Sequence, residues 1–219
     1  MHHSSALIFA NGEAADGALV VRALAQAGAA LTVAADGGAR VAARFGVQVQ
    51  VVIGDMDSLT APELEALAAA GAEIHRYPEE KDETDLELAL KFAAAKGIRY
   101  MRVLGAMGGR LDQTVSNIYL LALPELAGCD VRLVDGVQES WLMHPGENVV
   151  AGAPGDTLSL LPLSDAVYGV RTANLQYPLR DETLTFGPAR GISNVMQTDE
   201  AKVWFREGRL LAVYTLGRA

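Results

Sequence analysis

Residues 31–58 read LTVAADGGARVAARFGVQVQVVIGDMDS, and this stretch decides the fold class. Leu31–Ala35 and Val49–Ile53 are short, apolar and β-prone, whereas Ala39–Phe45 between them has a helical pattern that stops at Gly46. A strand, a helix and a second strand joined by short turns predict two parallel strands with the helix as their crossover. The stretch therefore predicts an α/β unit.

The same alternation continues on both sides of this stretch. Capping boxes at Thr60–Glu63 and Thr84–Glu87 mark the starts of two further helices. We predict a parallel sheet with helices on both faces over residues 1–136, with all strand C-terminal ends at one edge. The expected strands are 6–10, 31–35, 49–53, 73–77, 101–104 and 131–134, and the expected helices are 18–27, 39–45, 60–70, 84–96 and 113–123.

The pattern changes after Gly136. Residues 157–161, 183–186, 202–205 and 210–216 are short strand-like runs separated by Gly, Pro, Asn and Asp, and no long helical pattern accompanies them. Residues 137–219 are therefore expected to form a small all-β domain.

Composition limits the class of partner. The 219 residues are 50% hydrophobic and carry a formal net charge of -9, which is typical of a globular protein that repels nucleic acid and anionic membranes. Cys129 is the single cysteine, and we find neither a signal peptide pattern nor 18 consecutive apolar residues. These observations lead us to expect a cytoplasmic protein.

Aspartates follow the predicted strands at the points where the strands end. Ligands of open α/β sheets bind at this edge, so we expect the carboxylates to share one site. Clustered carboxylates are unfavourable without a cation, and their hard oxygens favour magnesium, manganese or calcium over zinc. A metal ion, magnesium above all, would let this acidic protein hold a polyphosphate. The aspartates are Asp36, Asp55, Asp57, Asp82, Asp85 and Asp112.

Helix capping or turn formation is the alternative for any single aspartate, and we keep it for Asp82 in particular. Asp55 and Asp57 are harder to explain in that way, because both can face one ligand only if the chain turns there, as Gly54 permits.

Glycines and cations complete the expected phosphate site. Gly37-Gly38 and Gly108-Gly109 allow backbone N–H groups to approach phosphate oxygens at helix N-termini, with simple turn formation as the alternative. Arg110 suits bidentate phosphate contact, and Lys81 is a second candidate cation. The motifs of P-loop kinases and of dinucleotide-binding oxidoreductases are absent.

Four motifs in this order resemble those of the thiamine pyrophosphokinase family in its bacterial form. They are Asp-Gly-Gly at 36–38, Gly-Asp-x-Asp-Ser at 54–58, Lys-Asp-x-Thr-Asp at 81–85, and Gly-Gly-Arg-x-Asp ending at Asp112. Residues 175–179 (LQYPL) and 190–194 (RGISN) are similar to the family's C-terminal pattern. The resemblance covers nearly the whole chain, and the ordered set is far more specific than any one motif.

The resemblance implies an α/β domain (1–136) that binds ATP and magnesium, and a β-sandwich-like domain (137–219) that binds thiamine and mediates dimerisation. It implies a homodimer whose active sites combine the acidic edge of one subunit with the β domain of the other. The implied reaction transfers diphosphate from ATP to the hydroxyl of thiamine and releases AMP.

Residue roles follow from the same resemblance. The implied magnesium ligands are Asp36, Asp55, Asp57 and Asp85. The implied catalytic residues are Asp57, Asp82, Asp85 and Arg110. The residues implied to bind ATP and its phosphates are Asn11, Gly37, Gly38, Ser58, Lys81, Thr84, Gly109, Arg110, Asp112 and Gln113. Those implied to bind thiamine are Tyr177, Ser193 and Asn194.

Two positions depart from the pattern of relatives. Gln113 stands where the family usually has His, and Gln cannot titrate near neutral pH. Tyr177 falls where animal members carry a Trp against the thiamine ring, and a Tyr can still stack on a cationic heterocycle.

Three other functions fit the same motifs less well. A pterin pyrophosphokinase could share the scaffold, although residues 191–194 (GISN) favour thiamine. A non-catalytic module that binds thiamine or a nucleotide is suggested only by Gln113. A phosphatase would consume ATP without an added alcohol.

Overall fold

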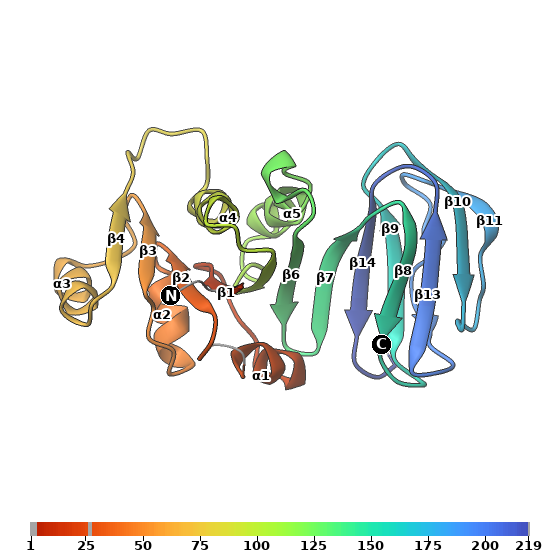
Figure 1. The fold of residues 1–219 in the computed structure, drawn as a ribbon, viewed down its shortest axis with the longest axis horizontal. Helices are drawn as coiled ribbons and strands as arrows, with labels where there is room; N and C mark the ends of the chain where they lie inside the picture. Colours follow the sequence, from red (N-terminus) through yellow and green to blue (C-terminus); the bar gives the residue numbers. More distant parts are fainter. Residues whose placement is uncertain (1–3, 26–27, 219) are drawn as a thin grey trace. The chain divides into compact units, whose positions relative to one another are not determined.

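The computed structural model describes residues 4–25 and 28–218. The chain forms two compact units, Met1–Gly136 (unit 1) and Val137–Ala219 (unit 2). Unit 1 is a sheet with flanking helices and unit 2 is built from antiparallel strands, so the predicted fold class is confirmed (Figure 1).

Unit 1 contains a parallel sheet in the order β6-β5-β1-β2-β3-β4. Strands β2, β3 and β4 follow one another on one side of β1, and the chain then crosses to the other side of β1 to add β5 and β6. Its elements are β1 (Ser5–Phe9), α1 (Ala18–Leu24), β2 (Leu31–Ala35), α2 (Gly38–Arg44), β3 (Val51–Gly54), α3 (Ala61–Ala69), β4 (Glu73–Arg76), α4 (Asp85–Ala95), β5 (Tyr100–Leu104), α5 (Leu111–Leu120), the 3-10 turn η1 (Pro124–Leu126) and β6 (Asp130–Asp135).

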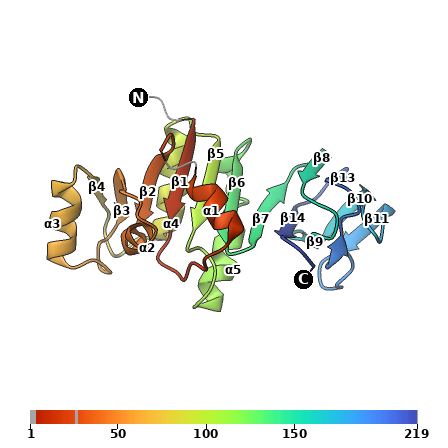
Figure 2. The ribbon, with the colours of Figure 1, turned by 90° about the horizontal axis from the view of Figure 1, so that it is seen from below.

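The core of unit 1 lies on both faces of its central strands. Ile8, Phe9, Val33 and Ile53 are fully buried, and successive residues of a strand point to opposite faces. Helix α4 packs on β1, β2 and β3, α2 packs on β1 and β2, and α1 packs on β6. Helix α3 lies beside the edge strand β4 and buries none of its residues (Figures 1 and 2).

Element ends differ from the sequence prediction by a few residues. The first helix was expected over 18–27 but ends at Leu24, and residues 26–27 lie outside the described part of the chain. Helix α5 begins at Leu111, ahead of the expected Gln113. At both expected capping boxes a side chain caps a backbone N–H, with Thr60 N donating to Glu63 Oε2 at 2.8 Å and Glu87 N donating to Thr84 Oγ1 at 3.2 Å.

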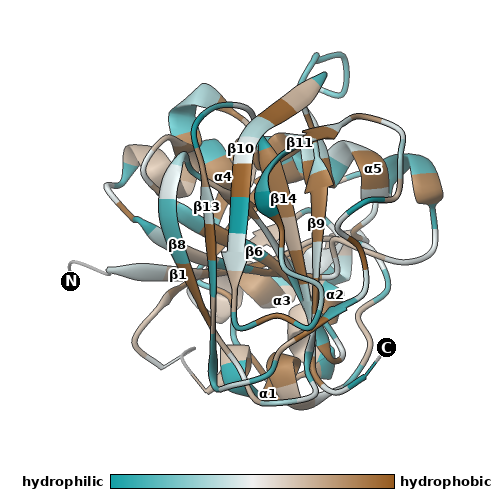
Figure 3. Cartoon of the chain, turned by 90° about the vertical axis from the view of Figure 1, so that its right-hand side faces the viewer, coloured by the Kyte–Doolittle hydropathy of each residue, from teal (hydrophilic) through white to brown (hydrophobic). Residues whose placement is uncertain are grey.

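Unit 2 consists of two antiparallel sheets in the orders β12-β9-β14-β7 and β11-β10-β13-β8. Strand β13 alternates exposed and buried residues, which gives its sheet one buried face, and Figure 3 shows apolar segments along β9 and β14 of the other sheet. The strands are β7 (Gln138–Met143), β8 (Gly146–Ala151), β9 (Thr157–Pro162), β10 (Ala166–Ala173), β11 (Arg180–Thr185), β12 (Asn194–Val195), β13 (Glu200–Phe205) and β14 (Leu210–Thr215).

Within the residues that the structure describes, no helix is both long enough and apolar enough to cross a membrane.

Candidate active site

A cavity of 680 Å³ opens at the C-terminal ends of the parallel strands. Loops after β1, β2, β3 and β5, together with the segment that leads into α4 and the start of α5, supply its walls. Every lining residue belongs to unit 1. The predicted site residues that line the cavity are Asn11, Asp36, Asp55, Asp57, Ser58, Lys81, Thr84, Asp85, Gly109, Arg110 and Gln113.

Three of the predicted aspartates meet in one group. One carboxylate oxygen from each of Asp36, Asp55 and Asp57 lies within 4.8 Å of the others. The backbone that brings them together is unusual, because Asp36 has φ 45° and Met56 has φ 69°. Positive φ is costly for a residue as bulky as Met, and such strain is typical of functional sites. The left-handed turn at Met56 lets Asp55 and Asp57 line the same cavity.

The geometry of Gly54 also serves this group. Its φ is 155°, and a Cβ there would lie 2.9 Å from Asp36 Cβ and 3.0 Å from Asp85 Cγ. A side chain at this position would therefore push two carboxylate residues away from the cavity. The sequence prediction that Gly54 permits the turn is incomplete, because Met56 shares the left-handed backbone.

The residues present fit a divalent cation. Asp36 is 3% exposed, and its Oδ1 is buried without a hydrogen-bond donor among the described residues. A buried carboxylate oxygen without a partner is unfavourable, and a metal ion would satisfy it. The group offers only carboxylate oxygens, which are the ligands that magnesium prefers.

Lys81 neutralises part of the acidic wall. Its Nζ lies 2.9 Å from Asp55 Oδ2 and 3.1 Å from Asp85 Oδ1. The hydrogen bond from Lys81 lowers the pKa of Asp55, whereas burial raises the pKa of Asp85 even though Lys81 opposes that shift. Asp85, a predicted metal ligand, lies outside the group of three carboxylates and contacts Lys81 instead.

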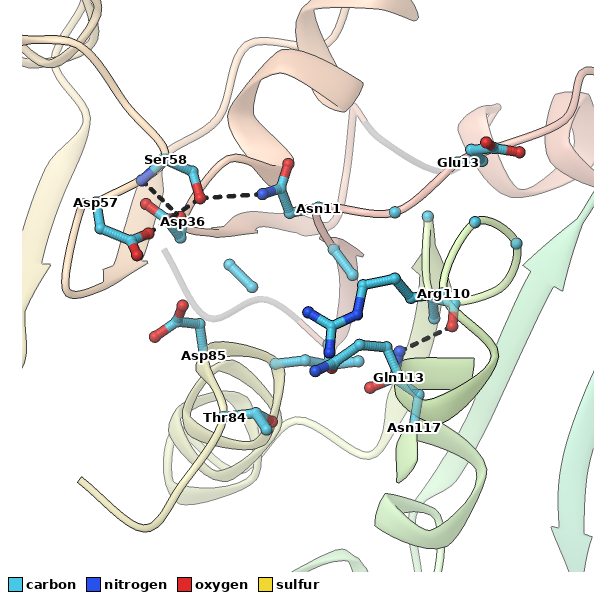
Figure 4. A pocket seen from close by; sticks show the side chains of 18 of the residues that line it. Asn11, Glu13, Asp36, Asp57, Ser58, Thr84, Asp85, Arg110, Gln113 and Asn117 are labelled. Atoms are coloured by element: carbon cyan, nitrogen blue, oxygen red, sulfur yellow. Dashed lines mark hydrogen bonds between the residues drawn. The ribbon is translucent and has the colours of Figure 1, made fainter. Parts of the chain in front are cut away.

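A chain of hydrogen bonds fixes the wall formed by the loop after β3. Asn11 Nδ2 donates to Ser58 Oγ at 3.1 Å, and Ser58 Oγ donates to Asp57 Oδ1 at 3.0 Å (Figure 4). Ser58 N donates to Asp36 Oδ2 at 3.3 Å. The loops after β1, β2 and β3 are thereby held in one arrangement.

Arg110 supplies the positive side of the cavity. Its guanidinium points into the cavity in Figure 4, and its side chain is 71% exposed. Arg110 pairs with Asp112 through Nη2–Oδ2 at 2.5 Å and Nε–Oδ1 at 3.2 Å, and this pairing lowers the pKa of Asp112. An exposed arginine of this kind can form two parallel hydrogen bonds from its guanidinium to a phosphate.

Four predicted site residues of unit 1 do not line the cavity, namely Gly37, Gly38, Asp82 and Asp112. Asp82 is exposed. The glycines have a packing reason, because a Cβ on Gly38 would lie 1.9 Å from Phe9 O and one on Gly37 would lie 2.4 Å from Asn11 Oδ1. Close approach of α2 to the end of β1 therefore requires glycine at position 38, whereas a side chain at position 37 would displace the Asn11 side chain.

The cavity also contains residues that the sequence prediction omitted, among them Glu13, Glu83 and Asn117. Asn117 is 7% exposed, and its Nδ2 donates to Ala106 O at 2.8 Å. The sequence did contain a signal for Asn117, because it follows Gln113 by four residues on a predicted helix and so lies on the same helix face. Glu13 and Glu83 lie in loops, where no periodic pattern points to them.

The three predicted thiamine residues lie near one another in unit 2. Tyr177 is 56% exposed, and Ser193 is exposed with φ 55°. Asn194 is 5% exposed, and its side chain hydrogen-bonds the backbone of Tyr177.

Family models match most of the chain. The model described as "Thiamin pyrophosphokinase, catalytic domain" matches residues 23–133, and the one described as "Thiamin pyrophosphokinase, vitamin B1 binding domain" matches residues 147–210.

Individual relatives agree with these models. A thiamine pyrophosphokinase of Bacillus subtilis is 30% identical over 161 residues, which is 73% of this chain and 75% of the relative. Thiamine pyrophosphokinase 1 of Oryza sativa subsp. japonica is 25% identical over 73% of this chain and 64% of its own length. The crystal structure of the Bacillus subtilis enzyme superposes with a TM-score of 0.84 at 25% identity, covering 97% of this chain and 99% of that one. The Candida albicans enzyme shares the fold, with a TM-score of 0.82 at 16% identity, over 98% of this chain and 89% of its own.

Proposed function

The chain belongs to the thiamin pyrophosphokinase family, and from this premise we propose that the unit 1 cavity binds ATP with magnesium while unit 2 of a partner subunit presents thiamine. The family activity makes the chain an enzyme that uses ATP and transfers diphosphate to thiamine. One observation carries the assignment of the cavity: three aspartates, Lys81 and Arg110 line a single cavity at the strand ends.

The reaction balances as one displacement at phosphorus. The thiamine hydroxyl oxygen forms a bond to the β-phosphorus of ATP, and the bond from that phosphorus to the oxygen bridging to the α-phosphorus breaks. AMP leaves with the bridging oxygen, and the hydroxyl proton passes to a base. Attack in line with the leaving group requires little covalent chemistry from the protein, so positioning and charge neutralisation supply most of the acceleration.

Asp36, Asp55 and Asp57 would hold magnesium, with Asp85 as the further ligand that the motifs predict. When bound, magnesium offsets the charge of the phosphate oxygens during transfer. The unpartnered Oδ1 of Asp36 supports this assignment independently of the motifs.

The cations and the base of the chain have separate tasks. Lys81 and Arg110 would bind the phosphates, together with Asn11, Ser58, Thr84, Gln113 and the glycine N–H groups of the loops. Asp85 would orient the thiamine hydroxyl and accept its proton. Asp82 and Asp112 would act from the rim, since neither lines the cavity.

We further propose a homodimer in which Tyr177, Ser193 and Asn194 of one subunit complete the cavity of the other. The cavity is lined by unit 1 alone, whereas these three residues belong to unit 2. A cytoplasmic location fits a kinase that depends on ATP.

The direct test measures AMP formation by the purified chain with ATP and magnesium, with and without thiamine. AMP that requires thiamine and is lost on chelating the metal is the expected result. AMP formed without thiamine would identify an ATP-hydrolysing enzyme instead. Saturable thiamine binding without AMP would identify a binding module, and transfer to a pterin but not to thiamine would identify the other acceptor.

A further inference from the structure

The loop that carries Tyr177 is fastened to two neighbouring segments. On one side, Gln176 N donates to Val195 O and Gln197 N donates to Asn174 O, both at 2.9 Å. On the other side, Thr172 N donates to Leu179 O at 3.0 Å, and Leu179 N donates to Thr172 Oγ1 at 2.8 Å. The tip of the loop, Tyr177-Pro178, lies beyond both sets of backbone bonds.

The Asn194 side chain extends the backbone bonds with residues 195–197 as far as Tyr177 at the tip of the loop. Its Nδ2 donates to Tyr177 O at 2.7 Å, and its Oδ1 accepts from Tyr177 N at 2.9 Å and from Val195 N at 3.0 Å. A carboxamide has the same donor and acceptor as a peptide group, so Asn194 acts as one more residue of the ladder. Its burial, at 5% exposure, protects these bonds from water.

These bonds occupy the carbonyl oxygen of the Asn194 side chain and one of its two Nδ2 N–H groups. Both acceptor positions of Oδ1 are in use, and the side chain is almost completely covered. A ligand that donated a hydrogen bond to Asn194 Oδ1 would have to displace the backbone N–H of Tyr177 or of Val195. The Tyr177 ring, in contrast, is 56% exposed, and its hydroxyl accepts from Gln176 Nε2 at 3.2 Å.

We infer that Asn194 is a positioning residue, which holds the Tyr177 ring in the orientation that stacks on the flat, cationic ring of the acceptor substrate. This inference rests on the proposed function of unit 2 as the thiamine-binding part. Pro178 contributes as well, because a residue before proline is restricted to extended conformations. A ring that is fixed before binding loses less freedom when the substrate arrives.

Ser193 differs from its neighbour in the sequence. Its backbone N–H donates to Ser159 Oγ at 2.9 Å, and no hydrogen bond to its hydroxyl occurs among the described residues. The Ser193 hydroxyl therefore remains available for a direct contact with substrate, whereas the Asn194 carbonyl oxygen does not.

The test is a double-mutant cycle on thiamine KM, with Asn194→Ala, Tyr177→Ala and the double variant. We expect each single substitution to raise thiamine KM by about tenfold, since each removes an interaction worth roughly 1.4 kcal/mol. The double variant should be no worse than Tyr177→Ala, because Asn194 acts only through the ring. Multiplying effects, about a hundredfold in total, would overturn the inference and make Asn194 a direct contact.

Two further variants separate positioning from general damage. Asn148→Ala also removes a side chain that hydrogen-bonds backbone carbonyls in unit 2, with Nδ2 2.9 Å from His144 O, and it should lower thermal stability without raising thiamine KM. Asn194→Asp keeps the acceptor for Tyr177 N but places an oxygen against Tyr177 O, so it should raise thiamine KM even if Asn194→Ala does not fold.

The ATP KM should stay unchanged in every variant of the cycle. A purely structural role for Asn194 would lower the melting temperature and leave thiamine KM as in the wild type, which would overturn the inference. Failure of the proposed function is distinguishable, because the wild-type chain itself would then form no thiamine-dependent AMP.

Discussion

Asp57 lines the cavity because of the left-handed turn at Met56, and its Oδ1 accepts a hydrogen bond from the Ser58 hydroxyl at 3.0 Å. Asp57→Asn keeps the shape and this hydrogen bond but removes one negative charge from the three-carboxylate group. We expect kcat/KM for thiamine to fall by at least about 100-fold, because charge stabilisation in the transition state is lost. Steady-state AMP formation at several magnesium concentrations would measure the effect.

Asp165→Asn is the matched control for this substitution. Asp165 is exposed in unit 2, so the same change of charge should leave turnover and melting temperature unaltered. Wild-type turnover by the Asp57→Asn variant would show that the metal site has been assigned to the wrong residues.

Gly54→Ala tests whether the close approach at the strand end matters. The added Cβ would meet Asp36 and Asp85 at 2.9–3.0 Å on a backbone of φ 155°. We expect loss of most activity together with a free energy of unfolding lower by about 2 kcal/mol. Activity assays and urea unfolding would report the two effects separately.

Gly71→Ala separates backbone strain from crowding. Gly71 has φ 92°, and no described atom would lie within 4 Å of its Cβ, so only strain is added. This variant should lose stability but keep its activity. Equal losses of activity in both variants would mean that Gly54 does not act through the carboxylates.

Single residues of the site were predictable where a general rule places them. Aspartates after parallel strands face one edge of the sheet, and Asp36, Asp55 and Asp57 do meet there. The positive φ of Met56 has no sequence signal, because nothing in a methionine side chain favours it. The role of Asn194 was equally hidden, since its partner is the backbone of a residue 17 positions away.

Strands β5 and β6 carry an ion-pair cluster around Asp130, and we expect it to contribute to stability against acid. Burial alone would raise the pKa of Asp130, but Arg132 Nε and Arg102 Nη2, each 3.0 Å from its carboxylate, outweigh burial and hold the pKa below its usual value. A carboxyl with a lowered folded pKa contributes stability above its unfolded pKa of about 3.9, and this contribution disappears as the pH falls through the folded pKa.

Asp130→Asn should therefore lower the free energy of unfolding by about 2 kcal/mol at neutral pH. The difference from the wild type should shrink as the pH falls below about 4, because the wild-type carboxyl then becomes protonated too. Urea unfolding at a series of pH values checks both statements, with the exposed Asp199→Asn as the control. A difference that is constant with pH would rule out the ion pairs as its cause.

Elements with a strong period were predicted well, and weakly patterned ones were not. The expected strand at Leu31–Ala35 matches β2 at both ends, because an apolar run between turn residues is a clear signal. Four strands of unit 2, namely β7, β8, β10 and β12, lie outside the runs that the sequence analysis named. Strand β8 buries few residues, and β10 is interrupted by a register shift between Val167 and Val170, where Gly169 has φ 69°.

Mixing two impaired variants, assayed at a thiamine concentration well below the wild-type KM, tests the proposed assembly of the whole molecule. Asp57→Asn damages the unit 1 cavity, and Tyr177→Ala damages the proposed thiamine surface of unit 2. If active sites combine residues of two subunits, each mixed dimer contains one intact site. Equal mixing followed by subunit exchange should then restore about a quarter of wild-type activity.

The size of the assembly should be measured on the same samples by light scattering. Exposed Asp165→Asn mixed with Asp57→Asn serves as the control for dilution by active subunits. No recovery of activity in a confirmed dimer would place the thiamine residues in the same subunit as the cavity that they serve.

The pairing of distant strands is the part of the molecule that the sequence predicts least. In unit 2, β14 pairs with β7 and β9, and β13 pairs with β8 and β10, although long stretches of chain separate these partners. Short strands with similar alternation have many possible partners, so local pattern predicts their existence but not their neighbours. In unit 1, the right-handed crossover rule removes most of this ambiguity.

Every residue around the unit 1 cavity comes from the first 136 positions, and the Tyr177 loop comes from the last 83. Evolution can therefore alter the acceptor while the inherited phosphate chemistry stays intact. Recombination near the junction would exchange one vitamin or heterocycle for another in a single event, and a chimaera with a foreign β unit is the natural starting point for a kinase of new specificity.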